Sequence, residues 1–129
     1  MTVRVVDASA VVLHVAGTPA DPRGRFTEVD CHAPHLIDAE CGHVFRWAVR
    51  RGELSADEGY AALRAAHAIV DSRHSHAPLN RIAWMLRDQL SYFDALYVAL
   101  AVRLDVPLVT RDRRLAAAPK LPCRVELVG

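Results

Sequence analysis

The sequence predicts an α/β fold in which a parallel sheet carries helices on both faces. Short apolar runs at 3–6 and 107–110 are typical of strands that are buried on both sides. Segments with helical hydrophobic spacing separate the predicted strands, and this alternation predicts parallel strand pairing. With 129 residues, the chain has the size of one domain, so we expect residues 1–129 to form a single unit.

The first part of the chain predicts two strands and two helices. The strand at 3–6 consists of β-branched and basic residues, and an apolar helix is predicted over 8–15. Proline and glycine residues predict a loop over 17–25. A second short strand is predicted over 29–33. From Leu36, apolar residues recur at helical spacing until Gly52 closes the helix.

The second part of the chain predicts four further helices and up to three strands. Ser55 and Glu58 have the spacing of a capping box and begin a helix that continues to Ser72. The segment "RHSHAPLN" is a break that could hold a short strand. The remaining predicted elements are helices at 82–90 and 91–104, a strand at 107–110, a short helix at 113–118 and a strand at 124–128.

Composition excludes several classes of protein. The net charge is +1 and Lys120 is the only lysine, so no general basic field favours nucleic acid. Three cysteines without paired spacing indicate a reducing compartment. The start lacks the basic segment of a signal peptide, and no apolar stretch is long enough to span a bilayer. We therefore expect a cytoplasmic protein without a membrane partner.

Four acids occupy positions that are unusual for surface acids. Asp7 and Asp112 follow predicted buried strands, and Asp94 is the only charge in the apolar stretch 91–102. Glu40 lies one turn into the helix that follows the second strand. In parallel sheets, ligand sites form outside the carboxyl ends of the strands, near the point where the strand order reverses. The four side chains could therefore meet there.

Each acid also has an ordinary explanation. Asp7 and Asp112 could cap the helices that follow them, Asp94 could pair with Ser91 in a capping arrangement, and Glu40 could be a solvated helix residue. Several carboxylates at one sheet edge would nevertheless repel one another unless a cation neutralised them. Carboxylate ligands with room for water suit Mg²⁺ or Mn²⁺ better than zinc.

Four segments resemble PIN-domain ribonucleases, and among them the VapC toxins of bacterial toxin–antitoxin pairs. They are "VVDASA", "APHLIDAE", "LSYFDALYVALA" and "PLVTRD", in family order and with family-like spacing along essentially the whole chain. The resemblance implies a PIN-like three-layer fold with a mainly parallel five-stranded sheet. It also implies an endoribonuclease that hydrolyses RNA phosphodiester bonds with metal-activated water.

The resemblance also assigns roles to individual residues. The residues implied to be catalytic and to hold Mg²⁺ or Mn²⁺ are Asp7, Glu40, Asp94 and Asp112. Ser9 and Thr110 match the hydroxyl positions that support these ligands. Some relatives carry a further acid or amide after the last aspartate, and its absence here leaves one or two ions open. Arg111, Arg113 and Arg114 are candidate RNA contacts, or else solvated arginines at a helix start.

The resemblance further implies partners: an RNA substrate, a second copy of the chain in a homodimer, and a cognate VapB-like antitoxin whose C-terminal segment blocks the acidic site. Val44, Trp47 and Leu63 are possible antitoxin contacts, with packing in the core as the alternative. The sequence does not indicate which RNA is cut.

The sequence also contains residues that suggest other kinds of site. Cys31, His32, His35, Cys41 and His43 suggest zinc, but their spacings fit no standard zinc finger. A phosphorylated Asp7 would need companion acids that are absent, and neither a nucleophile elbow nor a glycine-rich phosphate loop occurs. A PIN-like module that binds RNA or a partner without turnover remains as the alternative function.

Overall fold

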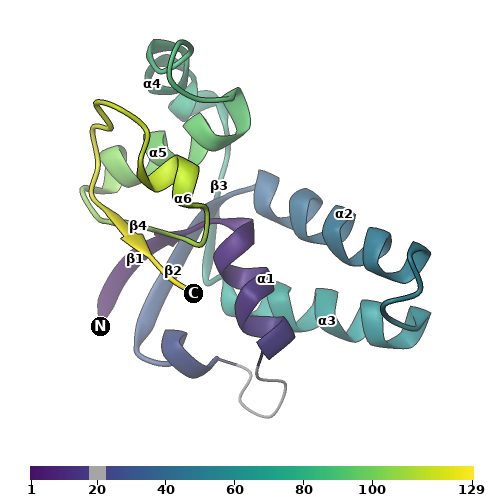
Figure 1. Ribbon diagram of the computed structural model, residues 1–129. Helices are drawn as coiled ribbons and strands as arrows, with labels where there is room; N and C mark the ends of the chain where they lie inside the picture. Colours follow the sequence, from purple (N-terminus) through teal and green to yellow (C-terminus); the bar gives the residue numbers. More distant parts are fainter. Residues whose placement is uncertain (18–22) are drawn as a thin grey trace.

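The sheet has five strands, and every neighbouring pair is parallel. A computed structural model describes residues 1–17 and 23–129 (Figure 1). The strand order is β3-β2-β1-β4-β5. The strands are β1 (Thr2–Val6), β2 (Val29–Pro34), β3 (Ser72–His74), β4 (Leu108–Thr110) and β5 (Val125–Leu127). The predicted α/β class and five-stranded sheet are confirmed; the predicted third strand begins at Ser72, one residue before the segment "RHSHAPLN", and ends at His74.

Helices flank this sheet in two layers. The α-helices are α1 (Ala8–Gly17), α2 (Leu36–Arg50), α3 (Ala56–Ile69), α4 (Asn80–Met85), α5 (Tyr92–Leu104) and α6 (Arg113–Ala116). Two short 3-10 helices, η1 (Gly24–Phe26) and η2 (Ala77–Leu79), complete the described elements. Figure 1 shows α1, α2 and α3 on one side of the sheet, with the α2–α3 hairpin projecting away from it, and α4 and α5 on the other side.

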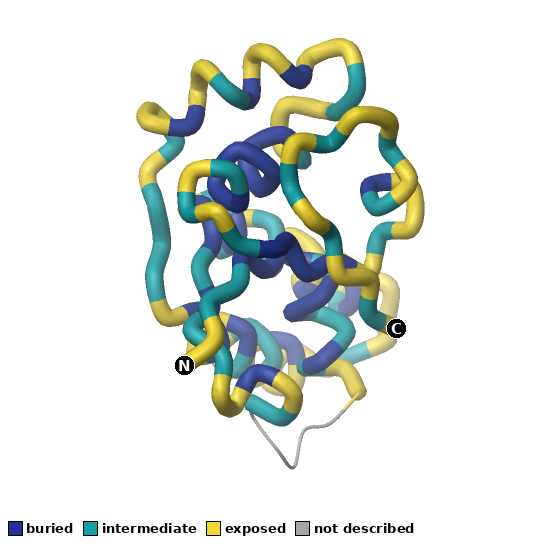
Figure 2. The backbone as a smooth tube through the Cα atoms, turned by 90° about the vertical axis from the view of Figure 1, so that its left-hand side faces the viewer, coloured by how far each residue is buried: buried dark blue, intermediate teal, exposed yellow. Residues whose placement is uncertain are grey.

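The core is centred on α5 and the middle strands. Seven consecutive residues of α5, from Ala95 to Ala101, are buried, and this continuous burial explains why the helix is apolar nearly all round. Val5 and Val6 of β1 and Leu108 of β4 are fully buried beside it. Figure 2 shows this buried centre enclosed by exposed loops and helix faces. None of the helices in the described ranges is long and apolar enough to cross a membrane.

Several predicted boundaries differ from the structure, three of them most clearly. The helix predicted to reach Ser72 ends at Ile69, because Val70 is already extended and β3 pairs with β2 from Ser72 onward. The helix predicted over 82–90 is the shorter α4, which begins at Asn80 and ends at Met85. The predicted loop at 17–25 includes residues 18–22, which lie outside the described residues, and its end forms η1.

The strand order places a site at one edge of the sheet. The chain runs outward from β1 through β2 to β3, and then returns to β4 on the other side of β1. The order therefore reverses between β1 and β4, where a parallel sheet leaves a crevice at the carboxyl ends of its strands. Asp7 directly follows β1, and Asp112 lies two residues after the end of β4.

Candidate active site

One pocket brings together all four acids singled out in the sequence. Its volume is about 760 Å³, and it lies at the carboxyl ends of β1 and β4 between α1, α2 and α5. We call it the acid cleft, defined by the acids that line it: Asp7, Glu40, Asp94 and Asp112. Its wall also contains apolar side chains, among them Val12, Leu36 and Phe93. Residues more than 100 positions apart in sequence thus share one small cavity.

Asp7 is the most buried of the four acids, with 6% of its surface exposed. Its Oδ1 accepts hydrogen bonds from Ser9 Oγ (2.7 Å) and from the Ala10 backbone N–H (3.0 Å), and its Oδ2 accepts one from Thr110 Oγ1. Burial raises the pKa of Asp7, and the charge of Asp112 adds to this, although the three hydrogen bonds lower it. Asp7 therefore both caps α1, as the ordinary explanation held, and lines the acid cleft.

Two hydroxyls connect the ends of β1 and β4 beside Asp7. Ser9 Oγ lies 3.2 Å from Thr110 Oγ1 and accepts a hydrogen bond from the Arg111 backbone N–H at 3.0 Å. Thr110 is fully buried and also accepts a bond from the Asp112 backbone N–H at 3.0 Å. This network fixes the orientation of Asp7 and the position of the backbone at Asp112.

Asp112 and Asp94 sit at the N-terminal ends of two helices. Asp112 Oδ1 caps α6 by accepting bonds from the N–H groups of Arg114 (2.9 Å) and Leu115 (3.2 Å), whereas its Oδ2 accepts none from the described residues. Ser91 caps α5 by accepting the Asp94 backbone N–H at 3.2 Å. Burial raises the pKa of Asp94, and so do the charges of Asp112 and Asp7.

Glu40 is held by a residue that the sequence did not single out. The Tyr97 hydroxyl on α5 donates a hydrogen bond of 2.6 Å to Glu40 Oε1. Burial raises the pKa of Glu40, the charges of Asp94 and Asp7 raise it further, and the Tyr97 hydrogen bond acts in the opposite direction. The signal for Tyr97 was its position three residues after Asp94 on one helix, which places both side chains on a similar face.

The acid cleft carries negative charge without a paired cation. None of its four acids forms an ion pair with another described residue. Within the described ranges, no three His, Cys, Asp or Glu side chains stand close enough to hold one ion directly. The donor set still fits Mg²⁺ or Mn²⁺, because Mg²⁺ usually keeps several water molecules and is bound by only one or two carboxylates. It does not fit zinc, which takes three or four direct protein ligands.

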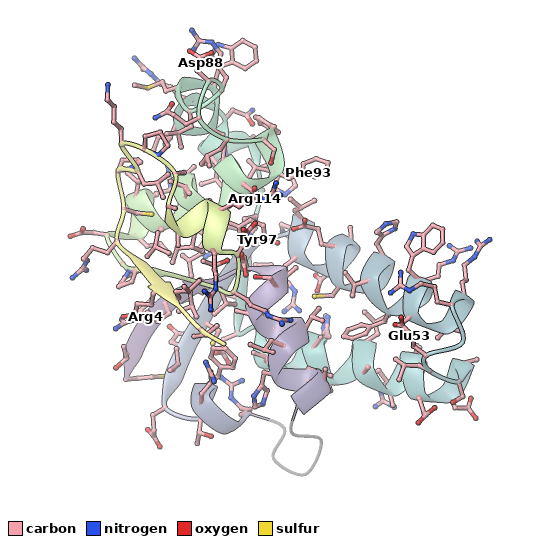
Figure 3. All side chains as sticks on the ribbon, viewed as in Figure 1. Arg4, Glu53, Asp88, Phe93, Tyr97 and Arg114 are labelled. Atoms are coloured by element: carbon pink, nitrogen blue, oxygen red, sulfur yellow. The ribbon has the colours of Figure 1, made fainter. Side chains whose placement is uncertain are left out.

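The three predicted RNA-contact arginines are placed differently. Arg111 is exposed and lines the acid cleft. Arg114 is exposed and close enough to Asp94 that its charge opposes the rise in the Asp94 pKa. Figure 3 labels Arg114 together with Phe93 and Tyr97, two residues of α5 that line the cleft. Arg113 is exposed and is not among the residues that line the cleft.

The predicted antitoxin contacts also divide into two groups. Val44 is 39% exposed and lines the acid cleft, and Trp47, one turn further along α2, is 44% exposed. Leu63 is partly buried and packs against the core. Core packing therefore accounts for Leu63, whereas Val44 and Trp47 are open to solvent.

The residues that suggested zinc do not form a common site. Cys31 and Cys41 are buried in the hydrophobic core, and burial raises the thiol pKa of each, to about 11 and about 12. His32 instead bonds to the side chains of Asp30 and His74, both at 2.9 Å. The zinc interpretation is thus disfavoured.

Comparison with known proteins agrees with this geometry. The sequence matches the PIN domain family over residues 4–121. The chain belongs to the PIN-domain family. It is 51% identical over 128 residues to Ribonuclease VapC1 of Mycobacterium tuberculosis, with 96% of each chain covered, which places it in the VapC branch of the family.

Solved structures share the fold at lower sequence identity. PAE2754 from Pyrobaculum aerophilum superposes on this PIN domain with a TM-score of 0.76 at 23% identity, covering 96% of this chain and 83% of that one. A chain of DNA-bound VapBC from Salmonella typhimurium gives a TM-score of 0.73 at 14% identity, with 98% of each chain covered. These likenesses confirm the PIN-like fold.

Proposed function

We propose that this VapC-family protein is an endoribonuclease that depends on Mg²⁺ or Mn²⁺ and hydrolyses RNA phosphodiester bonds. The observation that carries the proposal is the acid cleft: four carboxylates from distant segments line one pocket, and none has a cationic partner among the described residues. Relatives that are named ribonucleases support RNA as the substrate.

Asp7, Asp94, Asp112 and Glu40 would hold the ion together, one or two of them through a direct bond and the others through its water molecules. A divalent ion bound there lowers the pKa of a water molecule and stabilises the charge that develops on the phosphate oxygens. The hydroxyls of Ser9 and Thr110 keep Asp7 in one orientation, and Asp112 retains Oδ2 free for a ligand. One ion or two would satisfy this arrangement.

Substrate binding would use the cleft rim. Arg111 and Arg114 offer guanidinium groups to RNA phosphates and offset the repulsion by the acids. Phe93 is 58% exposed and lines the cleft, so its ring can stack on an unpaired base. A single-stranded or looped RNA fits this site better than a regular duplex, whose bases are not accessible for stacking.

The proposal includes a VapB-like antitoxin that covers the acid cleft, action in the cytoplasm, and assembly as a homodimer. Solved VapBC complexes from Rickettsia felis and Salmonella typhimurium support the antitoxin as a partner. Val44 lines the cleft, Trp47 lies one turn further along α2, and both are exposed, so these are the contacts that we propose for it.

The test is cleavage of total cellular RNA by the purified, antitoxin-free protein with Mn²⁺, with Mg²⁺ and with excess chelator. The Asp94→Asn variant runs beside it under the same conditions. We expect discrete cuts that require both the metal and Asp94. Cleavage by Asp94→Asn at the wild-type rate would overturn the site assignment. RNA binding without any cleavage by folded, metal-loaded protein would instead favour a non-catalytic PIN-like module.

A further inference from the structure

Glu40 differs from the other acids of the cleft in how it is held. Asp7 accepts backbone and hydroxyl bonds from residues two or three positions away, in addition to Thr110. Asp112 accepts two N–H groups of its own helix. Within the described residues, the Glu40 carboxylate accepts one side-chain hydrogen bond, from Tyr97, which lies 57 positions away on α5. In the part of the chain that the structure describes, no local backbone group donates a hydrogen bond to the Glu40 carboxylate.

The electrostatic surroundings make this single bond more important. Asp94 and Asp7 both act on Glu40 with like charge, and a half-buried glutamate with free rotamers would turn away from them. The bond to the Tyr97 hydroxyl opposes this movement, because a donor aimed at a carboxylate forms a charge-assisted hydrogen bond. Oε1 is engaged by this bond, and Oε2 is left for a ligand or a water molecule.

Tyr97 is built as a rigid donor. Only 1% of its surface is exposed, and it lies within the continuous buried stretch of α5. A ring that is packed on all sides keeps its hydroxyl in one place, since core side chains occupy single rotamers at high packing density. Figure 3 shows Tyr97 on α5, between that helix and the start of α2.

We propose that Tyr97 is a positioning residue that holds Glu40 in the acid cleft, so that its carboxylate is available to the divalent ion. This inference rests on the proposed metal-dependent nuclease function. It assigns to Tyr97 no contact with RNA or with the reacting atoms, and it predicts that loss of one oxygen atom from a buried ring weakens ion binding.

The chain supplies a matched control on the same helix. Tyr92 also lies on α5 and also donates its hydroxyl, to Asn80 Oδ1 at 2.5 Å, but it is 44% exposed and does not line the acid cleft. Tyr97→Phe and Tyr92→Phe each remove one donated hydrogen bond from α5. Only the first bond reaches an acid of the cleft.

The experiment measures Mn²⁺ affinity by isothermal titration, in parallel with kcat and KM for RNA cleavage. Loss of a group that orients a metal ligand lowers affinity or activity by about 10- to 100-fold, so we expect Tyr97→Phe to raise the Mn²⁺ Kd about 10-fold and to lower kcat similarly. KM for RNA should stay within about twofold, and Tyr92→Phe should match the wild type.

A double-mutant cycle separates positioning from general damage to the core. In a Glu40→Ala background, Tyr97→Phe should not weaken Mn²⁺ binding further, because the carboxylate that it positions is gone. An equal loss in both backgrounds would overturn the inference. Glu40→Ala removes the acceptor of the same hydrogen bond and leaves the buried Tyr97 ring in place. The comparison therefore holds even if Tyr97→Phe lowers the yield of folded protein.

The remaining outcomes are distinct. If the wild type binds Mn²⁺ and cleaves RNA and Tyr97→Phe does both equally well, the positioning role is wrong and the proposed function stands. If the wild type neither binds Mn²⁺ nor cleaves RNA, the proposed function fails and the role of Tyr97 fails with it.

Discussion

Asp38 and Glu40 lie two residues apart on α2 but in opposite electrostatic surroundings. Asp38 accepts bonds from Arg73 Nε (2.7 Å) and Nη2 (2.9 Å), and this partner lowers the pKa of Asp38. Glu40 faces other acids in a half-buried position, and burial raises its pKa. An acid with an arginine partner thus stabilises the fold, whereas a buried acid without one marks a place where a cation can bind.

Asp71 is a second acid with an arginine partner, Arg23. The Asp71 carboxylate accepts the Cys31 N–H at 2.8 Å and two bonds from Arg23. The guanidinium of Arg23 also donates to four backbone carbonyls, those of Phe26, Val29, Ala68 and Ile69. Burial alone would raise the pKa of Asp71, but the hydrogen bonds that Asp71 accepts from Cys31 and Arg23 outweigh burial, so its pKa is lowered. Asp38 and Asp71 are hereafter the paired acids.

The largest effect is expected when Glu40 and Asp38 of α2 are each replaced by the corresponding amide. Glu40→Gln should lower RNA cleavage by at least about 10- to 100-fold, since it removes a group that holds the ion. Its melting temperature without metal should stay the same or rise, because the substitution removes a buried charge that faces like charges. Asp38→Asn should do the reverse, with cleavage retained and stability lowered by about 1 kcal/mol.

Cleavage rates and thermal melts of the two variants, measured in the same buffer, check this prediction. Cleavage by Glu40→Gln at the wild-type rate would contradict the distinction between cleft acids and paired acids. An Asp38→Asn variant that is inactive but fully stable would contradict it as well.

Arg23→Met should have a smaller effect, confined to stability. It removes the cation of Asp71 and leaves four carbonyls without this donor. Hydrogen bonds to charged groups contribute about 1.5–3 kcal/mol each to stability, and partial exposure and rehydration reduce the net loss here to about 2–3 kcal/mol. Urea unfolding measures this loss, and cleavage per folded molecule should not change. Loss of activity in a folded Arg23→Met protein would contradict the prediction.

The pH dependence of Mn²⁺ stabilisation should be next in size. Burial raises the pKa values of Asp7, Glu40 and Asp94, so in metal-free protein these acids favour the folded state below their unfolded pKa values. That contribution is lost as the pH rises through their folded pKa values. The paired acids behave oppositely: their stabilisation exists above their unfolded pKa values and is lost as the pH falls through the lowered ones.

Mn²⁺ should therefore stabilise the protein more at pH 7 than at pH 5, where protons compete for the same carboxylates. At ten times the Kd, the gain at pH 7 is about 1.4 kcal/mol. Thermal melts with and without Mn²⁺ across this pH range measure it. Equal stabilisation at both pH values would show that Mn²⁺ acts elsewhere.

The smallest effect is expected at Arg51, which sharpens the comparison from the other side. Arg51 Nε bonds to Glu53 Oε1 at 3.0 Å, and the pKa of Glu53 is lowered as it is for the paired acids. Both side chains are more than half exposed, so water screens their attraction. Arg51→Ala should leave the melting temperature and cleavage within experimental error. A clear loss of stability would mean that pairing matters even without burial.

The fold and the meeting of the four acids at one end of the sheet could be predicted from the sequence, because both follow from local patterns. Apolar runs defined β1 and β4, and the acids that follow them converge wherever the strands are parallel neighbours. Tyr97 was missed because its hydroxyl meets Glu40 only after α2 and α5 have packed. Arg113 and Arg114 could not be separated, because their difference depends on how the single-turn α6 is turned toward the cleft. The end of α3 was misplaced because pairing of β3 with β2 outweighs a continuing helical pattern.

Isothermal titration of Mn²⁺ into the wild type, Asp94→Asn and Asp71→Asn would show whether the acid cleft binds a divalent cation. The account predicts that the wild type binds Mn²⁺ at the acid cleft, that Asp94→Asn weakens this binding by at least about 10-fold, and that folded Asp71→Asn binds as the wild type does. Equal affinities for all three proteins, or no binding by the wild type, would contradict the claim that unpaired acids in this fold form a divalent-cation site.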